Sequence, residues 1–182
     1  MTPNRLFEFA VPENYEWALP ESDCDYDSFR RFGQPQGTAW HPVAMKLLRQ
    51  DDHGRTQQFA DLPWFGEHVL ILRPSAVRAL GDLCREAGEL LPLTCQDAEL
   101  MAWNVTNAID ALDFEKSKVV RFPTSGRVMK VTEHVFRPHR VQGCHAFRVP
   151  ELNTIYVDEE FTARVRDAKL TGTSFRQVWA LS

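Results

Sequence analysis

The sequence has few cysteines and lacks the long apolar runs that membrane proteins need. Its longest apolar stretches are as short as residues 69–72, against the roughly 20 apolar residues of a membrane-spanning helix. Glu8 interrupts the only apolar run near the N-terminus, which is not typical of a secretory signal. The four cysteines are widely spaced and form no CxxC pair, so we interpret them as free thiols. We therefore expect the protein to stay in the cytoplasm.

Motifs for cofactors, metals and nucleophiles are also missing. The sequence contains no GxxxxGK[ST], GxGxxG or GxSxG motif. His134, His139 and His145 do not have the i, i+4 spacing that places two zinc ligands on one helix face. The acids of residues 23–27 resemble the start of a calcium loop, but the glycine and glutamate expected further on are missing. We predict no catalytic residues, no cofactor and no metal site.

What is present is the composition of an ordinary globular chain, in which charge is unevenly distributed. Of 182 residues, 43% are hydrophobic and 25% are charged, and the net charge is −4. This profile predicts a single domain over residues 1–182, without overall attraction to nucleic acid or anionic membranes. Residues 1–30 contain seven acids and two bases, a net charge of −5. Residues 116–150 contain eight bases and one acid, a net charge of +7.

Hydrophobic periodicity predicts two main helices, over about residues 75–86 and 158–168. A proline precedes the first helix, and we expect Gly88 to close it as a left-handed cap. Asp158 is a favourable N-cap for the second helix, whose apolar face includes Phe161.

Short apolar stretches separated by turn residues predict strands, and they do not alternate with helices as in a Rossmann-type fold. We therefore expect an α+β fold with a largely antiparallel sheet. The predicted strands cover residues 6–10, 43–49, 68–72, 99–105, 118–122, 127–136, 144–149, 154–157 and 174–179.

The acidic N-terminal segment has one stretch that suggests a contact with a partner. Residues 21–29 hold four acids and two aromatics without helical or strand periodicity. Acids there can steer a basic partner and aromatics can anchor it, while the alternative is a solvated loop. The candidate partner-binding residues are Asp23, Asp25, Tyr26, Asp27 and Phe29.

Two other groups of residues leave alternative functions open. The basic stretch 116–150 includes Phe122, Phe136 and Phe147. If these rings stack on bases, the stretch is a nucleic-acid-binding module. The alternative is that it forms ordinary strands with solvated Lys and Arg side chains. Asp110 and Asp113 could act as paired carboxylates in a catalytic cleft, although an Asp113 turn is the simpler interpretation.

Six short motifs follow one another in order along the chain. The motifs are GELLPL (88–93), NVT (104–106) leading to Asp110, Asp113 and Ser117, HVF (134–136), AFRVP (146–150), IYV (155–157) with Phe161, and LTG (170–172) with Phe175 and Val178–Trp179. This ordered set resembles the eleventh immunity-protein family of bacterial polymorphic toxin systems. The resemblance covers residues 40–180, whereas residues 1–39 match only loosely. Thr173 stands where this family pattern has a larger, often aromatic residue.

This resemblance implies a cytoplasmic protein that binds a toxin encoded beside it and occludes the toxin's active site. It supplies no catalytic residues to transfer, and it leaves Phe161 and Trp179 as expected core residues. The toxin would act in the cytoplasm, for example as a nuclease or an NAD-consuming enzyme. The alternatives are an enzyme that reverses the toxin's modification and the nucleic-acid-binding module described above.

Overall fold

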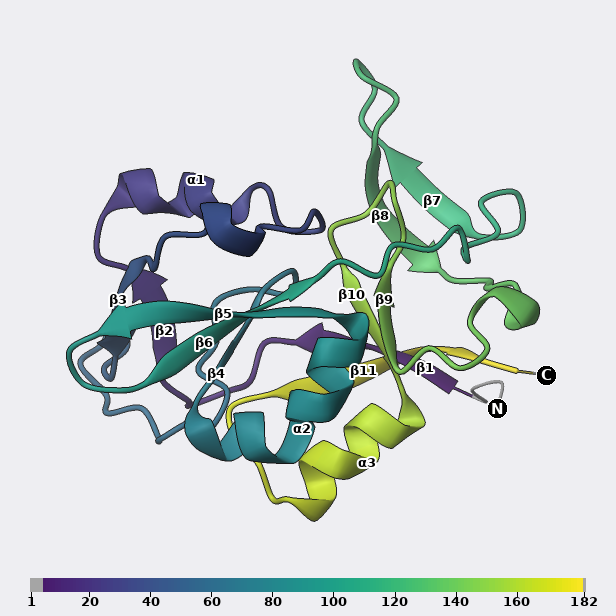
Figure 1. Ribbon diagram of the computed structural model, residues 1–182. Helices are drawn as coiled ribbons and strands as arrows, with labels where there is room; N and C mark the ends of the chain where they lie inside the picture. The colour runs from purple at the N-terminus through teal and green to yellow at the C-terminus, as the bar shows by residue number, and fades with distance from the viewer. Residues whose placement is uncertain (1–4, 182) are drawn as a thin grey trace.

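The structure, a computed structural model, describes residues 5–181, which form three β-sheets and two main helices (Figure 1). The strands are β1 (Arg5–Ala10), β2 (Trp17–Pro20), β3 (Ala44–Leu48), β4 (Leu70–Leu72), β5 (Gly88–Cys95), β6 (Leu100–Val105), β7 (Lys118–Arg121), β8 (Val128–Glu133), β9 (Ala146–Arg148), β10 (Ile155–Asp158) and β11 (Ser174–Ala180). The helices are α1 (Tyr26–Phe29), α2 (Pro74–Ala87) and α3 (Glu159–Asp167), with 3₁₀ turns η1 (Asp23–Asp25), η2 (Gly37–Ala39) and η3 (Pro138–Arg140).

The sheets confirm the predicted α+β class and its mostly antiparallel pairing. One sheet has the order β11-β1-β10-β9 and is antiparallel throughout. The second has the order β2-β3-β5-β6-β4, in which β3 and β5 form the one parallel pair among the named strands of the described residues. The third is the β7–β8 hairpin, which pairs with neither of the other sheets. The chain therefore builds several small sheets instead of one.

Helix α2 forms where its periodicity predicts, and its apolar face covers the strands. Pro74 occupies the first turn, and the buried side chains include Leu80, Leu83 and Cys84. Gly88 is not the left-handed cap that we expected, because its backbone is extended (φ 170°) and it begins β5 directly. A side chain at Gly88 would lie 2.0 Å from the carbonyl oxygen of Asn104. This glycine is thus required for the close approach of β5 and β6, not for ending the helix.

Helix α3 begins as predicted, and its central aromatic lies in the main core. The Asp158 carboxylate accepts the backbone N–H of Phe161 at 2.9 Å, as an N-cap should. Phe161 is fully buried, with its ring stacked on Trp103 at 5.4 Å and edge-on to Phe9 at 5.9 Å. The last strand reaches this cluster through Phe175.

The four-stranded sheet separates two hydrophobic clusters. Ile155 and Val157 point into the cluster beneath α2 and α3, whereas Tyr156 between them points into the other cluster. Trp179 belongs to that other cluster, where it is partly buried near Phe136. Trp179, expected in the core, therefore lies on the face of the sheet opposite Phe175. Regular alternation would place residues 175 and 179 on the same face, but the register of β11 against β1 shifts between Leu6 and Phe7, which turns Trp179 to the other side.

The nine predicted strands all overlap observed ones, and the prediction missed β2 and β5. Within residues 5–181, no helix is long and apolar enough to cross a membrane.

Candidate functional site

The acidic segment, residues 21–29, is a short helical structure, although its sequence has no helical periodicity. Residues 23–25 form η1 and residues 26–29 form α1, with the Ser22 hydroxyl accepting the N–H of Cys24 at 3.4 Å. Phe29 is only 3% exposed and packs against Phe32 and Phe65, with ring centroids 5.2 and 4.8 Å away. Phe29 is thus a core residue that fixes the segment to the body, which corrects its predicted role as an exposed anchor.

The outer side of this segment presents acids around one aromatic ring. Tyr26 is 38% exposed and stacks on Phe65, with ring centroids 5.9 Å apart. Asp23 and Asp27 are exposed and Asp25 is partly exposed. Asp27 forms an exposed ion pair with Arg30 at 3.0 Å. The sequence analysis did not single out Phe65, because its contact with Tyr26 joins residues 39 positions apart and leaves no local signal.

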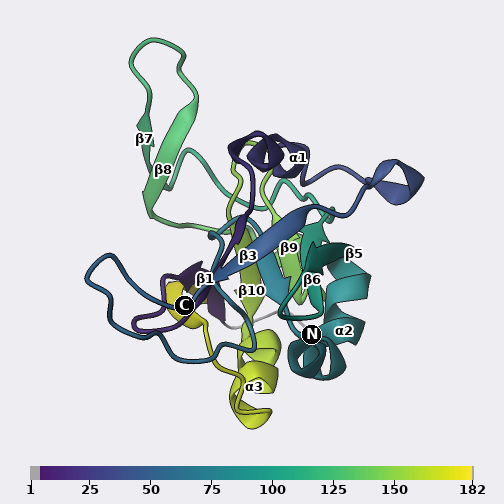
Figure 2. The same cartoon turned by 90° about the vertical axis from the view of Figure 1, so that its left-hand side faces the viewer.

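The basic stretch contains a hairpin that projects from the body of the molecule. Figures 1 and 2 show β7 and β8 extending away from the other sheets. Gly126, with φ +67°, lies in the turn between the two strands, where a left-handed backbone favours glycine. Three large apolar side chains of the hairpin are exposed, which are Val120, Phe122 and Met129. Their exposure leaves an apolar surface among basic residues.

This arrangement removes most of the predicted base-stacking surface. Phe136 and Phe147 are buried, at 2% and 0% exposure, and pack around Tyr156. Phe122 alone of the three candidate platforms is exposed, at 44%. A row of stacking rings over residues 116–150 is therefore not present, and we do not propose nucleic-acid binding.

The paired carboxylates have structural partners. Asp110 forms an ion pair with Arg137 at 3.0 Å. The Asp113 side chain accepts the N–H of Glu115 at 3.2 Å, and its carbonyl accepts the N–H of Ser117 at 2.9 Å. Asp113 therefore closes a turn, which is the simpler of the two interpretations given above.

The three histidines considered as metal ligands each have different surroundings. His134 contacts the Tyr156 hydroxyl at 3.1 Å, and His145 contacts the Asp158 carboxylate at 2.8 Å. His139 lies in η3. In the part of the chain that the structure describes, no group of three or more His, Cys, Asp or Glu side chains could hold a metal ion.

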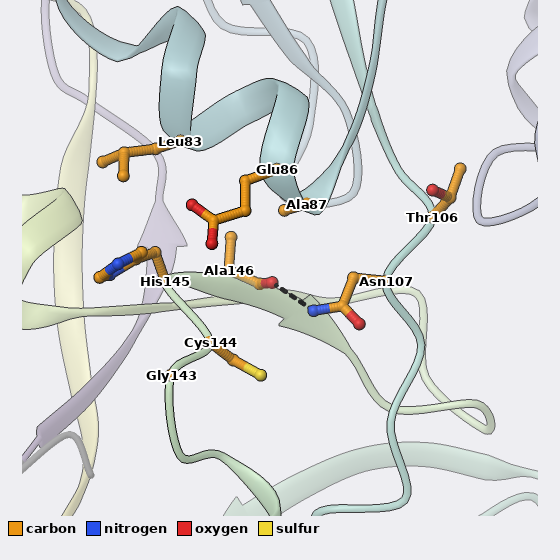
Figure 3. A pocket seen from close by; sticks show the side chains of 9 residues that line it. All are labelled: Leu83, Glu86, Ala87, Thr106, Asn107, Gly143, Cys144, His145 and Ala146. Carbon is orange, nitrogen blue, oxygen red and sulfur yellow. Dashed lines mark hydrogen bonds between the residues drawn. The ribbon is translucent and has the colours of Figure 1, made fainter. Parts of the chain in front are cut away.

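Cys144 and His145 line a pocket of about 370 Å³ at the C-terminal end of α2, together with Glu86 and Asn107 (Figure 3). The two side chains point in different directions, with the Cys144 sulfur turned away from the imidazole. His145 is also engaged by Asp158. The pocket thus lacks the nucleophile–base contact of a cysteine hydrolase.

Comparison with known families finds a match in the C-terminal part of the chain. A family model matches residues 98–180, which run from just before β6 to the end of β11. These residues match the immunity protein family (Imm11). The family inferred from the motifs is thereby confirmed over these residues, and we call residues 98–180 the Imm11 region. The wider extent of residues 40–180 stays a prediction. No curated protein matches the chain.

The Imm11 region includes α3 and the β7–β8 hairpin, whereas the acidic segment lies outside it. The family assignment suggests a general role in toxin neutralisation. It does not assign contact residues.

Proposed function

We propose that this protein neutralises a toxin encoded beside it by binding the toxin and covering its active site. The observation that carries the proposal is the Imm11 match over residues 98–180. A stable inhibitory complex would bury roughly 1,200–2,000 Å² of surface in total. Inhibition of this kind needs no chemistry from the immunity protein, so we propose that the protein is not an enzyme.

The proposed contact surface is the exposed side of the acidic segment, made of Asp23, Asp25, Tyr26 and Asp27. Phe29 supports it from beneath, because its burial holds α1 against the body. A surface that is ordered before binding loses less conformational entropy when the complex forms. Carboxylates increase the rate of encounter with a basic partner, and a tyrosine is a common energetic centre of interfaces.

This charge pattern fits a toxin with a basic substrate groove, as a nuclease that acts in the cytoplasm would have. A groove that binds nucleic acid carries Lys and Arg side chains, which are complementary to the acids of the segment. We accordingly propose that the protein acts in the cytoplasm.

The experiment that tests neutralisation by occlusion is a titration of toxin activity. The purified toxin domain is assayed with increasing amounts of this protein, and the mixture is analysed by size-exclusion chromatography. Occlusion predicts loss of activity at one equivalent, a stable complex, and an unmodified toxin that regains activity after separation. Full protection at a small fraction of an equivalent would instead indicate an enzyme that reverses the toxin's effect, and it would contradict the proposal.

The Tyr26 contact has its own test. We expect Tyr26→Ala to weaken binding to the toxin by about 2 kcal/mol, mainly through faster dissociation, if the ring fills a central pocket of the partner. The matched control is Phe122→Ala, which removes an aromatic of similar exposure from the hairpin. If Phe122→Ala dissociates faster from the toxin and Tyr26→Ala dissociates at the wild-type rate, the interface lies on the hairpin instead.

A further inference from the structure

One buried cation in the described residues has no carboxylate partner. The buried charged side chains are Glu8, Glu16, Arg148 and Asp158. Glu8 pairs with Arg176, Glu16 pairs with Arg73, and Asp158 contacts His145. Arg148, only 4% exposed, forms no ion pair within residues 5–181. A buried cation without a counter-charge is costly, so this position is unusual for a residue with a purely structural role.

Backbone carbonyls hold the Arg148 guanidinium in a fixed orientation. Its Nε donates to the carbonyl of Val105 at 2.9 Å, while its two terminal nitrogens donate to the carbonyls of Asn153 (2.6 Å) and His68 (2.5 Å). Each of its three nitrogens thus donates to one carbonyl, which accounts for three of the five N–H groups of a guanidinium. The other two N–H groups, one on each terminal nitrogen, can donate to a ligand. Burial lowers the pKa of Arg148 to about 10, which leaves the side chain charged at neutral pH.

Arg148 lines a pocket whose walls are mostly aromatic. The pocket has a volume of about 230 Å³ and lies between α1 and the segment that precedes β4. It is lined by Tyr26, Phe29, Arg30, Phe32, Phe65, His68, Arg148 and Asn153. His68 does not add charge, because burial and the nearby Arg148 lower its pKa. Arg30 already pairs with Asp27, so Arg148 is the cation without a counter-charge here.

We propose that this pocket binds a flat, singly charged carboxylate such as an aromatic acid. One buried positive charge is balanced by one negative charge, and a carboxylate can accept two parallel N–H bonds from a guanidinium. Phenyl and tyrosyl rings form the walls for a flat apolar body. The volume is below that of pockets for drug-sized ligands and suits a group of about one ring. The proposal does not depend on the toxin-binding role, since the ligand is a small molecule.

The test uses benzoate as the probe, benzamide as its neutral counterpart and inorganic phosphate as a competing anion. The ¹⁵N-labelled protein is titrated with each, and chemical shifts are followed by NMR. We expect saturable benzoate binding with shifts at the amides of Gly33, Phe65 and Asn153 and at the Arg148 Nε–H. Benzamide should bind at least tenfold more weakly, and phosphate should not displace benzoate.

Two variants separate the proposed counter-charge from a base outside the pocket. Arg148→Gln should weaken benzoate binding by at least tenfold, whereas Arg31→Gln, at an exposed residue that does not line the pocket, should change it by less than twofold. If Arg148→Gln does not fold, the proposal is tested on the wild-type protein, by which amides shift with benzoate and by how much more weakly benzamide binds. Equal binding of benzoate and benzamide, displacement by phosphate, or shifts confined to the β7–β8 hairpin would each overturn the proposal.

Discussion

The acidic segment and the β7–β8 hairpin are both charged and surface-exposed, but they are attached to the molecule in different ways. Phe29 fixes the acidic segment through a cluster of rings that includes Phe32, Trp40 and Phe65. In the hairpin, Val120, Phe122 and Met129 are exposed, and the two strands pair only with each other. The segment therefore presents its charges from a rigid support, while the hairpin has little packing beneath it. An isolated two-stranded sheet is at best marginally stable in water.

The difference shows that the direction of the aromatic side chains decides what a charged region can offer to a partner. An aromatic that points inward orders the acids around it, and an aromatic that points outward becomes part of the contact surface itself. The predictions below test this distinction, starting with a reference for full burial.

Phe161 sets the scale for a fully buried aromatic. We expect Phe161→Ala to lower the free energy of unfolding by about 3–5 kcal/mol, because the ring is completely buried between Trp103 and Phe9. Trp179→Ala should cost less, since Trp179 is only partly buried. Urea denaturation of both variants measures the difference. Equal losses would mean that Trp179 is packed as tightly as Phe161.

Phe29 and Phe122 provide the direct contrast between the two regions. We expect Phe29→Ala to destabilise the protein by about 3 kcal/mol, because the ring is 3% exposed in an aromatic cluster. Phe122→Ala should change stability by less than about 0.5 kcal/mol, as is usual for exposed positions. Thermal denaturation monitored by circular dichroism is sufficient. A stable Phe29→Ala variant would show that the acidic segment is not anchored as described.

The pH dependence of stability tests the burial of His134, which follows the hairpin in the sequence. Burial, together with the positive charge of Arg176, lowers the pKa of His134 to about 4 in the folded state. The unfolded state therefore binds the proton first, and the free energy of unfolding should fall as the pH drops from about 6.5 to about 4. We expect a contribution of about 1–2 kcal/mol, less than the full conversion of the shift, because the ring is partly exposed.

The control for this pH effect is His134→Gln, which keeps a hydrogen-bonding group beside the Tyr156 hydroxyl. The difference between the two stability–pH curves isolates His134 from other titrating groups. Parallel curves between pH 4 and 7 would contradict the buried, neutral state of this histidine.

The smallest expected effect concerns an ion pair of the hairpin. Lys118 and Glu133 face each other at 2.5 Å, but both side chains are more than 60% exposed. Replacing Glu133 with Gln should therefore change the free energy of unfolding by less than about 0.5 kcal/mol. Chemical denaturation at low and high salt measures it, and a loss above 1 kcal/mol would mean that the hairpin depends on this pair.

Regular patterns in the sequence were sufficient to predict both main helices and most strands. Strand β5 was missed because it follows α2 without a loop and contains Pro92, although Leu91 and Leu93 alternate with exposed neighbours. Pro92 is tolerated because β3 pairs only with the last two residues of β5. Strand β2, at only four residues, was too short to show a clear alternation.

The candidate site was less predictable, because its geometry depends on contacts between distant residues. Asp23 and Asp27 were correctly expected at the surface, whereas the burial of Phe29 requires Phe65, 36 positions away. The pocket around Arg148 likewise joins residues 26–32, 65–68 and 148–153. In the sequence Arg148 is one of eight bases in a charged stretch, and nothing local marks it as buried.

The central claim is that the acidic segment, and not the hairpin, meets the toxin. Its most direct test is the association rate with the toxin domain, measured by surface-binding kinetics at two salt concentrations. Three triple variants are compared. The segment variant replaces Asp23, Asp25 and Asp27 with Asn, and the hairpin variant replaces Lys118, Arg121 and Lys130 with Gln. The control variant, with the same charge change as the segment variant, carries Asp82→Asn, Glu160→Gln and Asp167→Asn on α2 and α3.

The account predicts that the segment variant associates at least several-fold more slowly and loses most of its salt dependence, since the steering charges are gone. The control, with the same change in net charge, should retain most of the wild-type rate. Unchanged association of the segment variant, with slower association of the hairpin variant, would contradict the claim.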